Sequence, residues 1–306
     1  MTVINMLSLG EEGIAVADEQ SSNRIRRYNS TQKLHFLNDD KVVYGGSGPA
    51  DLIKEIYDMS KQKLSEMDPD KKISLRNVYE LVNSTISDYR NWLKENFLRS
   101  NFGFGIDDFI TGTLIRASKP IDRQVMDAVN SCLRGFSENG SMQVLLGGIE
   151  NSRFVIYEVN SEGSGTKISR PYATIGSGQD ESDKILSSYI SHLSRSKRDN
   201  LERVEGLAKV LEATNASSRL NIGVGGAPLI VYIGKDKVRI PEENLCILAS
   251  EVVEGLTRDL LDRDLSYELL DKLIFNDCSF EEIEEEIKKG SKDWKKLDRI
   301  LRGYKI

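Results

Sequence analysis

The order of strand-like and helix-like segments is the feature that most constrains this fold. Short apolar runs separated by turn residues occupy residues 2–44, and two helical patterns follow over 49–100. Strand patterns return at 142–159, helical patterns follow at 180–195 and 200–213, and a last strand pattern covers 228–233. Closely spaced strands joined by hairpin-length turns predict antiparallel sheets, and the helix pairs predict layers that cover them. We therefore expect the α+β class, arranged as a four-layer α-β-β-α sandwich.

Two regions do not belong to this alternation. Residues of about 100–141 contain several glycines, a break at Pro120 and one helical pattern at about 122–133, which indicates an inserted lobe. From residue 245 onward the pattern is helical and charged, and Ser279 with Glu282 predicts a capping box that opens a helix. The expected organisation is a main domain over 2–244, with the insertion inside it, and a C-terminal helical extension over 245–306.

Composition excludes several classes of function. The net charge is −6, with acidic and basic residues interspersed, so no nucleic-acid-binding surface is expected. No apolar run approaches the roughly 18–20 residues that a membrane span needs. No basic segment followed by a sustained apolar stretch precedes Glu11, which argues against a signal peptide. We therefore expect a cytoplasmic protein that binds neither nucleic acid nor membrane.

The cysteines and histidines do not form a metal or disulfide pattern. Neither the three cysteines nor the two histidines have the spacing of a zinc site, and the cysteines predict no disulfide framework. The glycine-rich run at 223–226 precedes a strand instead of opening a helix after one, which is the wrong context for binding a pyrophosphate. We expect no cofactor and no metal, and any chemistry must use Thr, Ser, Lys, Asp, Glu or the α-amine.

Thr2 is the strongest candidate for such chemistry. It follows Met1 and begins an apolar strand-like run. If Met1 is removed, the threonine carries a hydroxyl and a free α-amine on one residue. A hydroxyl is a poor nucleophile at neutral pH, and an α-amine with a reference pKa of about 7.7–8.0 is well matched to act as its base. The start of the chain therefore predicts an N-terminal nucleophile.

The motifs around Thr2 resemble those of proteasome β-type subunits, which are N-terminal nucleophile (Ntn) hydrolases. After Thr2 come Gly13-Ile14-Ala15-Val16-Ala17-Asp18, then Gln32-Lys33-Leu34, then Gly45-Gly46-Ser47. Further downstream, the resemblance rests on the segments 143–149, 172–178, 205–206 and 225–226. It covers roughly residues 2–99 and 142–240, and the lobe and the C-terminal extension lie outside it.

The resemblance implies a role for each residue of the site. Thr2 would be the nucleophile, and Lys33 a cation that lowers the cost of forming its oxyanion. Asp18 would hold Lys33 charged and oriented. The backbone N–H of Gly46 would donate into an oxyanion hole, where the lack of a side chain lets the substrate carbonyl approach. Ser177 would join the hydrogen bonds around the α-amine.

The chain departs from the family at two positions near this amine. Counted back from Gly225, Asn221 falls where the family has an aspartate and Val224 where it has a serine. Asn can accept a hydrogen bond but carries no charge, and Val offers no donor. A competing alignment with a gap of about six residues uses Asn215 and Ser218 instead.

The leading interpretation is a threonine peptidase that opens amide bonds of a peptide or protein substrate through an acyl-enzyme ester on Thr2. An alternative is a transpeptidase or protein ligase, as in the methanogen connectases, which also resemble stand-alone proteasome subunits. A third reading is a non-catalytic scaffold in the manner of proteasome α subunits. The resemblance also implies self-association into rings or stacked dimers, which the lobe or the extension could block.

Overall fold

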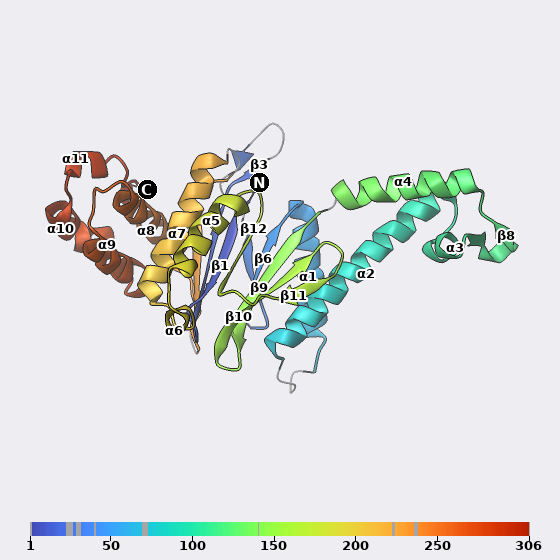
Figure 1. Cartoon of the computed structure of the whole chain (residues 1–306), viewed down its shortest axis with the longest axis horizontal. Helices are drawn as coiled ribbons and strands as arrows, with labels where there is room; N and C mark the ends of the chain where they lie inside the picture. The colour runs from blue at the N-terminus through green and yellow to red at the C-terminus, as the bar shows by residue number, and fades with distance from the viewer. Residues whose placement is uncertain are drawn as a thin grey trace.

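A computed structural model describes residues 2–22, 27–28, 32–39, 41–68, 73–139, 141–221, 224–235 and 238–305. The residues described form two five-stranded antiparallel sheets, and the protein belongs to the α+β class (Figure 1). Within the described residues, no helix has the length and apolarity that crossing a bilayer requires.

The first sheet has the strand order β12-β1-β2-β13-β14. Its strands are β12 (Tyr172–Ile175), β1 (Ile4–Ser8), β2 (Gly13–Asp18), β13 (Pro228–Ile233) and β14 (Val238–Arg239). The second sheet has the order β11-β10-β9-β6-β5. Its strands are β11 (Gly165–Lys167), β10 (Arg153–Asn160), β9 (Gln143–Glu150), β6 (Val42–Ser47) and β5 (Leu34–Leu37). Two small ribbons, β3 (Ser21–Ser22) with β4 (Arg27–Tyr28) and β7 (Thr113–Leu114) with β8 (Lys119–Pro120), lie outside these sheets.

The two sheets pack face to face, because alternate residues of their strands point to a shared core. Ile4 and Met6 of β1 are fully buried in this core, together with Val43 of β6 and Leu145 of β9. The residues between them point outward, to the helices.

Helices cover the outer face of each sheet. On the second sheet lie α1 (Ala50–Ser65) and α2 (Leu75–Phe102), which share a core with β6, β9 and β10. On the first sheet lie α5 (Gln179–Ser191) and α7 (Arg203–Leu220), with the short α6 (Arg195–Arg198) between them. Ser74 caps α2 with a capping box, and Gly103 ends it in the left-handed conformation.

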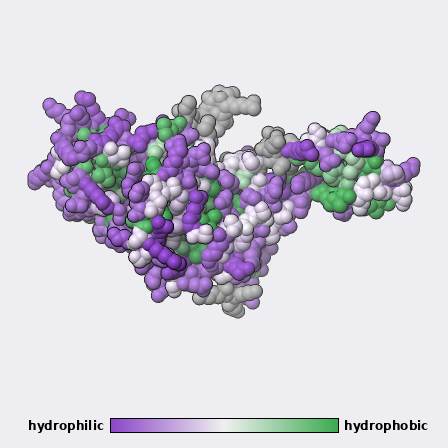
Figure 2. All heavy atoms as spheres, viewed as in Figure 1, coloured by the Kyte–Doolittle hydropathy of each residue, from purple (hydrophilic) through white to green (hydrophobic). Residues whose placement is uncertain are grey.

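The lobe forms an arm that projects from the body (Figure 1). It consists of the far end of α2, α3 (Ile106–Thr111), the turn Ile115–Ala117, and α4 (Arg123–Asn139). A small separate core around Leu98, Phe104 and Val129 holds it together. Apolar side chains gather on the surface of this arm (Figure 2). Two isoleucines of the arm are largely exposed, Ile110 at 74% and Ile115 at 54%.

The C-terminal segment is helical and packs on α7. It contains α8 (Glu243–Thr257), α9 (Arg263–Leu270), a π-helical turn (Asp271–Phe275), α10 (Phe280–Gly290), α11 (Trp294–Leu297) and a final 3₁₀ turn (Gly303–Lys305). The capping box predicted for α10 is present. One hydrophobic cluster runs from Leu7 in β1 through α7 to Leu301, so this segment shares a core with the first sheet. The predicted boundary between 244 and 245 falls inside the first turn of α8.

Several predicted bounds differ from the structure. The helix expected over 200–213 runs on to Leu220, and the one expected over 122–133 continues to Asn139. The pattern at 180–195 divides into α5 and α6. The hairpin between β9 and β10 turns on Asn151 and Ser152 alone, both at positive φ, which suits the twist of paired strands. Most of residues 19–31, including those between β3 and β4, lies outside the described residues.

Candidate active site

Strand register in the first sheet brings three of the predicted residues together. Ile4 of β1 lies opposite Ile175 of β12 and opposite Ala17 of β2. Continuing both registers toward the start of the chain places Thr2 beside Ser177 and Val3 beside Asp18. The predicted nucleophile, serine and carboxylate therefore meet at one end of the first sheet.

The second sheet contributes at its own strand ends. Leu34 of β5 pairs with Gly45 of β6, so the next position of this register sets Lys33 against Gly46. Lys33 is buried, with 7% of its surface exposed, and its ammonium reaches Asp18 in the first sheet. The site thus spans the two sheets at one edge of their shared core.

The turn after β12 holds the Thr2 backbone on both sides. Thr2 N donates to Ser177 Oγ at 3.0 Å, and Gly178 N donates to Thr2 O at 3.2 Å. Ser177 Oγ also lies 3.4 Å from Thr2 O. No hydrogen bond to the Thr2 hydroxyl occurs within the part of the chain that the structure describes. The nitrogen that would become the α-amine is therefore held by the turn that follows β12.

Asp18 organises the centre of the site with both of its carboxylate oxygens. Oδ1 accepts from Val3 N at 2.8 Å and from Lys33 Nζ at 2.7 Å. Oδ2 accepts from Gly225 N at 3.1 Å. One oxygen atom therefore joins the Lys33 ammonium to the residue that follows Thr2.

Burial sets the electrostatics of this pair. Removal from water raises the pKa of Asp18, and the Lys33 charge and the two backbone donors oppose that rise. Removal from water likewise lowers the pKa of Lys33, against the charge of Asp18. Lys33 Nζ also donates to Gln20 O at 2.5 Å. The ammonium is thus held by two acceptors while its proton is easier to give up than that of an exposed lysine.

Gly176 allows the turn to approach Thr2 this closely. Its φ is +99°, and a Cβ on it would lie 2.2 Å from Thr2 O and 3.1 Å from Ser47 Oγ. Only glycine fits such a backbone at that distance. Ser47, the last residue of β6, therefore also lies at this edge.

The structure supplies a packing reason for glycine at position 46. A Cβ on Gly46 would lie 2.3 Å from Cγ2 of Ile53 in α1, so the helix rests directly on the strand here. The missing side chain therefore makes room for α1, and the role of the Gly46 N–H in an oxyanion hole stays a prediction.

Asn221 lies at the C-terminus of α7, where its side chain donates back into the helix. Its Nδ2 reaches Ser217 O at 3.1 Å, and Val224 N donates to Asn221 O at 3.0 Å. Among the described residues no hydrogen bond links Asn221 to Thr2. Residues 222 and 223, which connect it to Val224, lie outside the described residues.

The residues of the competing alignment face elsewhere. Asn215 exchanges two hydrogen bonds with Ser250 of α8, at 2.7 and 3.0 Å, and so joins α7 to the C-terminal segment. Ser218 Oγ donates to Thr214 O within its own helix. Neither arrangement directs these side chains to Thr2.

Sequence reasoning missed Ser217, which supports the turn at the site. Its fully buried hydroxyl donates to Gly178 O at 2.7 Å and lies 2.9 Å from Ser182 Oγ. A serine in a helix whose end was placed at residue 213 gives no local signal of this role. Only the packing of α7 against the first turn of α5 reveals it.

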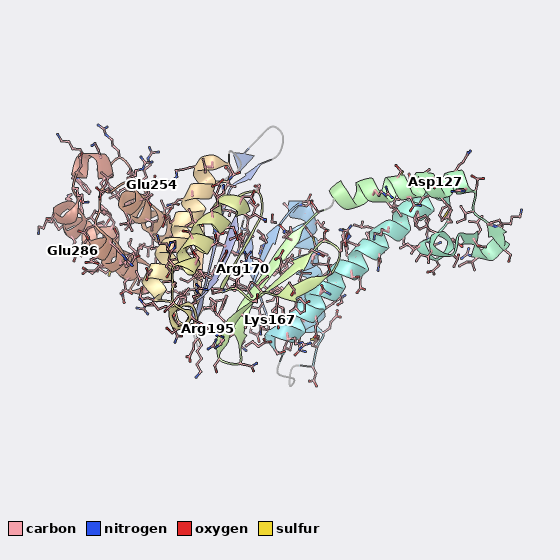
Figure 3. The ribbon with its side chains drawn as sticks, in the orientation of Figure 1. Asp127, Lys167, Arg170, Arg195, Glu254 and Glu286 are labelled. Carbon is pink, nitrogen blue, oxygen red and sulfur yellow. The ribbon has the colours of Figure 1, made fainter. Side chains whose placement is uncertain are left out.

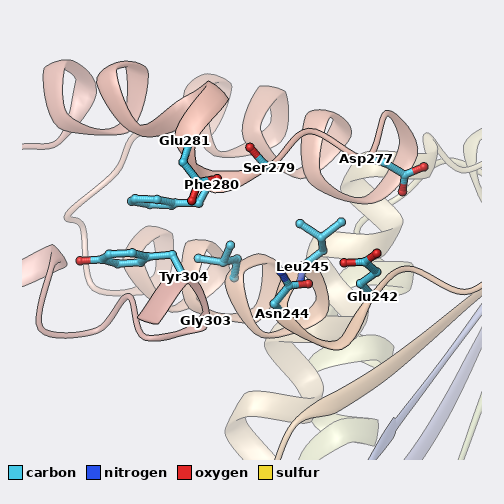
Figure 4. A pocket seen from close by; sticks show the side chains of 10 residues that line it. Glu242, Asn244, Leu245, Asp277, Ser279, Phe280, Glu281, Gly303 and Tyr304 are labelled. Carbon is cyan, nitrogen blue, oxygen red and sulfur yellow. The ribbon is translucent and has the colours of Figure 1, made fainter. Parts of the chain in front are cut away.

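Other features lie away from these residues. A cavity of about 320 Å³ lies in the C-terminal segment. The stacked rings of Phe280 and Tyr304 line it (Figure 4), and no residue of the candidate site does. Within the described ranges, no three His, Cys, Asp or Glu side chains gather where they could hold a metal ion.

The comparisons add no relative, since no model of a known protein family and no curated protein matches the chain.

Proposed function

We propose that this protein is a threonine-type N-terminal nucleophile hydrolase that cleaves amide bonds of a peptide or protein after Met1 has been removed. Thr2 Oγ1 attacks the substrate carbonyl carbon, and its proton passes to the α-amine of the same residue. The leaving amine takes up this proton as the C–N bond breaks. Water then hydrolyses the ester on Thr2.

The shared oxygen of Asp18 is the observation that carries this proposal. It links the Lys33 ammonium, at 2.7 Å, to Val3 N, at 2.8 Å, in a site where the pair is almost completely buried. The same carboxylate oxygen therefore holds both the cation and the residue that follows Thr2. A cation in such a medium of low dielectric stabilises an oxyanion much more strongly than a cation in water does.

The contact between Thr2 N and Ser177 Oγ supports the role of the amine. With Met1 removed, an amine at this position keeps its 3.0 Å partner and so keeps its orientation toward its own hydroxyl. Two stacked antiparallel sheets covered by helices, together with the motifs that resemble those of the Ntn hydrolases, favour the four-layer Ntn fold as the framework of this site.

Covalent labelling tests the proposal directly. The purified protein is weighed intact, to establish whether Met1 is present, and is then incubated with an epoxyketone or a β-lactone. We expect the protein without Met1 to gain one adduct, mapped to Thr2. Thr2→Ala should abolish the adduct, and Ser177→Ala should slow its formation by about tenfold or more, because the amine loses its fixed partner.

Matched controls make the result decisive. Ser191→Ala removes another exposed serine hydroxyl, at the end of α5, and should label at the wild-type rate. Within the described residues, this hydroxyl bonds to Ser188 O in its own helix and to the neighbouring His192. A processed protein that stays unlabelled under conditions that label a proteasome would contradict the hydrolase and favour the non-catalytic scaffold. An adduct on any residue other than Thr2 would contradict the assigned nucleophile.

Transpeptidation is the second candidate, and the arm is the feature that favours it. A Cβ on Gly48, two residues beyond Gly46, would lie 2.8 Å from Ser141 O, so the chain leaving α4 returns to the body beside the end of β6. The arm therefore starts next to the candidate site and could hold a second chain that attacks the ester with its amine in place of water. A peptide-pair assay separates the two outcomes, because only transpeptidation yields a joined product.

A further inference from the structure

A basic hollow of about 590 Å³ lies in the C-terminal segment, away from the residues around Thr2. Its lining consists of Arg258, Leu260, Lys296, Arg299, Ile300 and Arg302. Four of these six side chains are cations and none is acidic, although the whole chain carries a net charge of −6. Leu260 and Ile300 are half-buried and provide an apolar part of the wall.

The backbone that carries these cations is firmly anchored on α8. Leu297 and Leu301 are fully buried, and a Cβ on Gly255 would lie 2.9 Å from Leu297 Cδ1, so α11 touches α8 directly. One carboxylate oxygen of Glu251 accepts from the backbone N–H of Arg302 at 2.6 Å. The hollow is therefore formed before any ligand arrives, which lowers the entropic cost of binding.

The charges around the hollow are only partly balanced. Arg258 pairs with Glu254 at 2.6 Å, but the same carboxylate also binds Arg219 at 2.7 Å (Glu254 is labelled in Figure 3). Lys296 pairs with Asp293 at 3.2 Å. Within the described residues, the guanidinium groups of Arg299 and Arg302 have no acidic partner. The wall thus holds four cations close together, and within the described residues only Arg258 and Lys296 have an acidic partner.

We propose that this hollow binds a small molecule that carries two or more linked phosphate groups. Guanidinium groups present paired N–H donors that match phosphate oxygens, and several of them around one space suit a ligand with several negative charges. The volume lies within the range of about 300–1,000 Å³ that is usual for small-ligand sites. The apolar pair beside the cations offers a surface for a nucleoside or other organic part of such a molecule.

Calorimetric titration of the full chain tests this proposal, with tripolyphosphate and ATP as probes. We expect one saturable site that weakens as salt is added. The double variant Arg299→Ala/Arg302→Ala should bind the probes at least about tenfold more weakly than the wild type, because two charge-assisted contacts are lost. The matched control Lys289→Ala/Lys295→Ala removes the same charge from the same segment outside the hollow and should bind like the wild type.

Tighter binding of ATP than of tripolyphosphate identifies an organic phosphate as the ligand, and equal binding identifies the phosphates alone.

Three results would overturn the proposal that this hollow binds a molecule with linked phosphate groups. One is the absence of saturable binding of either probe at low ionic strength. Another is an equal loss in both double variants, which would mean attraction by overall charge. The third is a single-stranded RNA or a poly-glutamate peptide that binds through the same arginines more tightly than either probe, because the occupant would then be a macromolecule. Circular dichroism and thermal unfolding verify that the double variants fold, as expected for exposed side chains.

Discussion

Lys33 Nζ lies 2.7 Å from Asp18 Oδ1, with 6% and 1% of the two side chains exposed. Removing two opposite charges from water costs several kcal/mol per ion, so a pair this deeply buried adds little net stability. The pair does fix the orientation of the Lys33 ammonium, because the Asp18 carboxylate is itself held by the backbone N–H groups of Val3 and Gly225. We interpret the pair as a device that positions a cation beside Thr2.

A double-mutant cycle on this pair is the first prediction. Lys33→Met leaves the Asp18 carboxylate buried without its cation, and we expect it to lower the free energy of unfolding by about 3–5 kcal/mol. Lys33→Met/Asp18→Asn should lose less than the sum of the two single variants, because neither charge is then unpaired. Urea unfolding measures all four proteins. Strictly additive losses would mean that the two groups do not interact.

Gly176→Ala provides the second prediction, with Gly103→Ala as its control. Both glycines have positive φ, but a Cβ on Gly103 meets nothing within 4 Å, whereas one on Gly176 lies 2.2 Å from Thr2 O. Gly103→Ala should cost about 1–2 kcal/mol, for the left-handed backbone alone. Gly176→Ala should cost more and also abolish labelling of Thr2, because the turn moves away. Equal losses in the two variants, with labelling intact, would contradict this close contact.

The site residues that lie at the ends of strands are those that the sequence could predict. Thr2, Asp18 and Ser177 stand at the ends of strands, and register carries such residues to one edge once the pairing is known. Lys33 follows the same rule in the second sheet. The distance between the sheets is not encoded locally, so the length of the contact from Lys33 to Asp18 needed the structure.

The residues of α7 that support the site could not be predicted from the sequence in this way. The helix α7 continues past residue 213 through small polar residues that show no apolar period, yet Thr214 and Ser217 are buried there. Their hydroxyls bond to Val210 O and Gly178 O, so burial leaves no unsatisfied group. Tertiary contacts on both sides of α7, and not its own pattern, determine where it ends.

The third prediction separates packing from chemistry at Gly46. Gly46→Ala should destabilise the protein by about 1–3 kcal/mol, because the new methyl group would collide with Ile53. Adding Ile53→Ala makes room in α1, so the double variant should recover the rate of Thr2 labelling that the single variant loses. The backbone N–H is unchanged throughout. Continued loss of labelling in a folded double variant would show that the methyl group disturbs the site itself.

The fourth prediction concerns acid and His35. Burial, with Lys54 nearby, lowers the pKa of His35 below its usual 6.5, while Asp58 acts in the opposite direction. The unfolded chain therefore binds more protons below about pH 6.5, and the folded state loses stability as the pH falls through that window. His35→Phe keeps a ring to stack on Tyr57, 4.6 Å away, and should be less sensitive to pH between about 7.5 and 5. Identical slopes of unfolding free energy against pH for the two proteins would contradict this.

The fifth prediction tests whether the C-terminal segment folds together with the body. Leu297 is fully buried in the cluster that also contains Leu7 and Leu207, so Leu297→Ala should cost about 2–5 kcal/mol. Measured in a Trp92→Phe background, where Trp294 is the only tryptophan, the substitution should lower the midpoint of one cooperative transition seen both by circular dichroism and by fluorescence, because a shared core unfolds as a unit. Ile115→Ala, on the exposed surface of the arm, is the control and should change the midpoint little. An early transition confined to Trp294 would instead identify the segment as a separate module that only rests on α7.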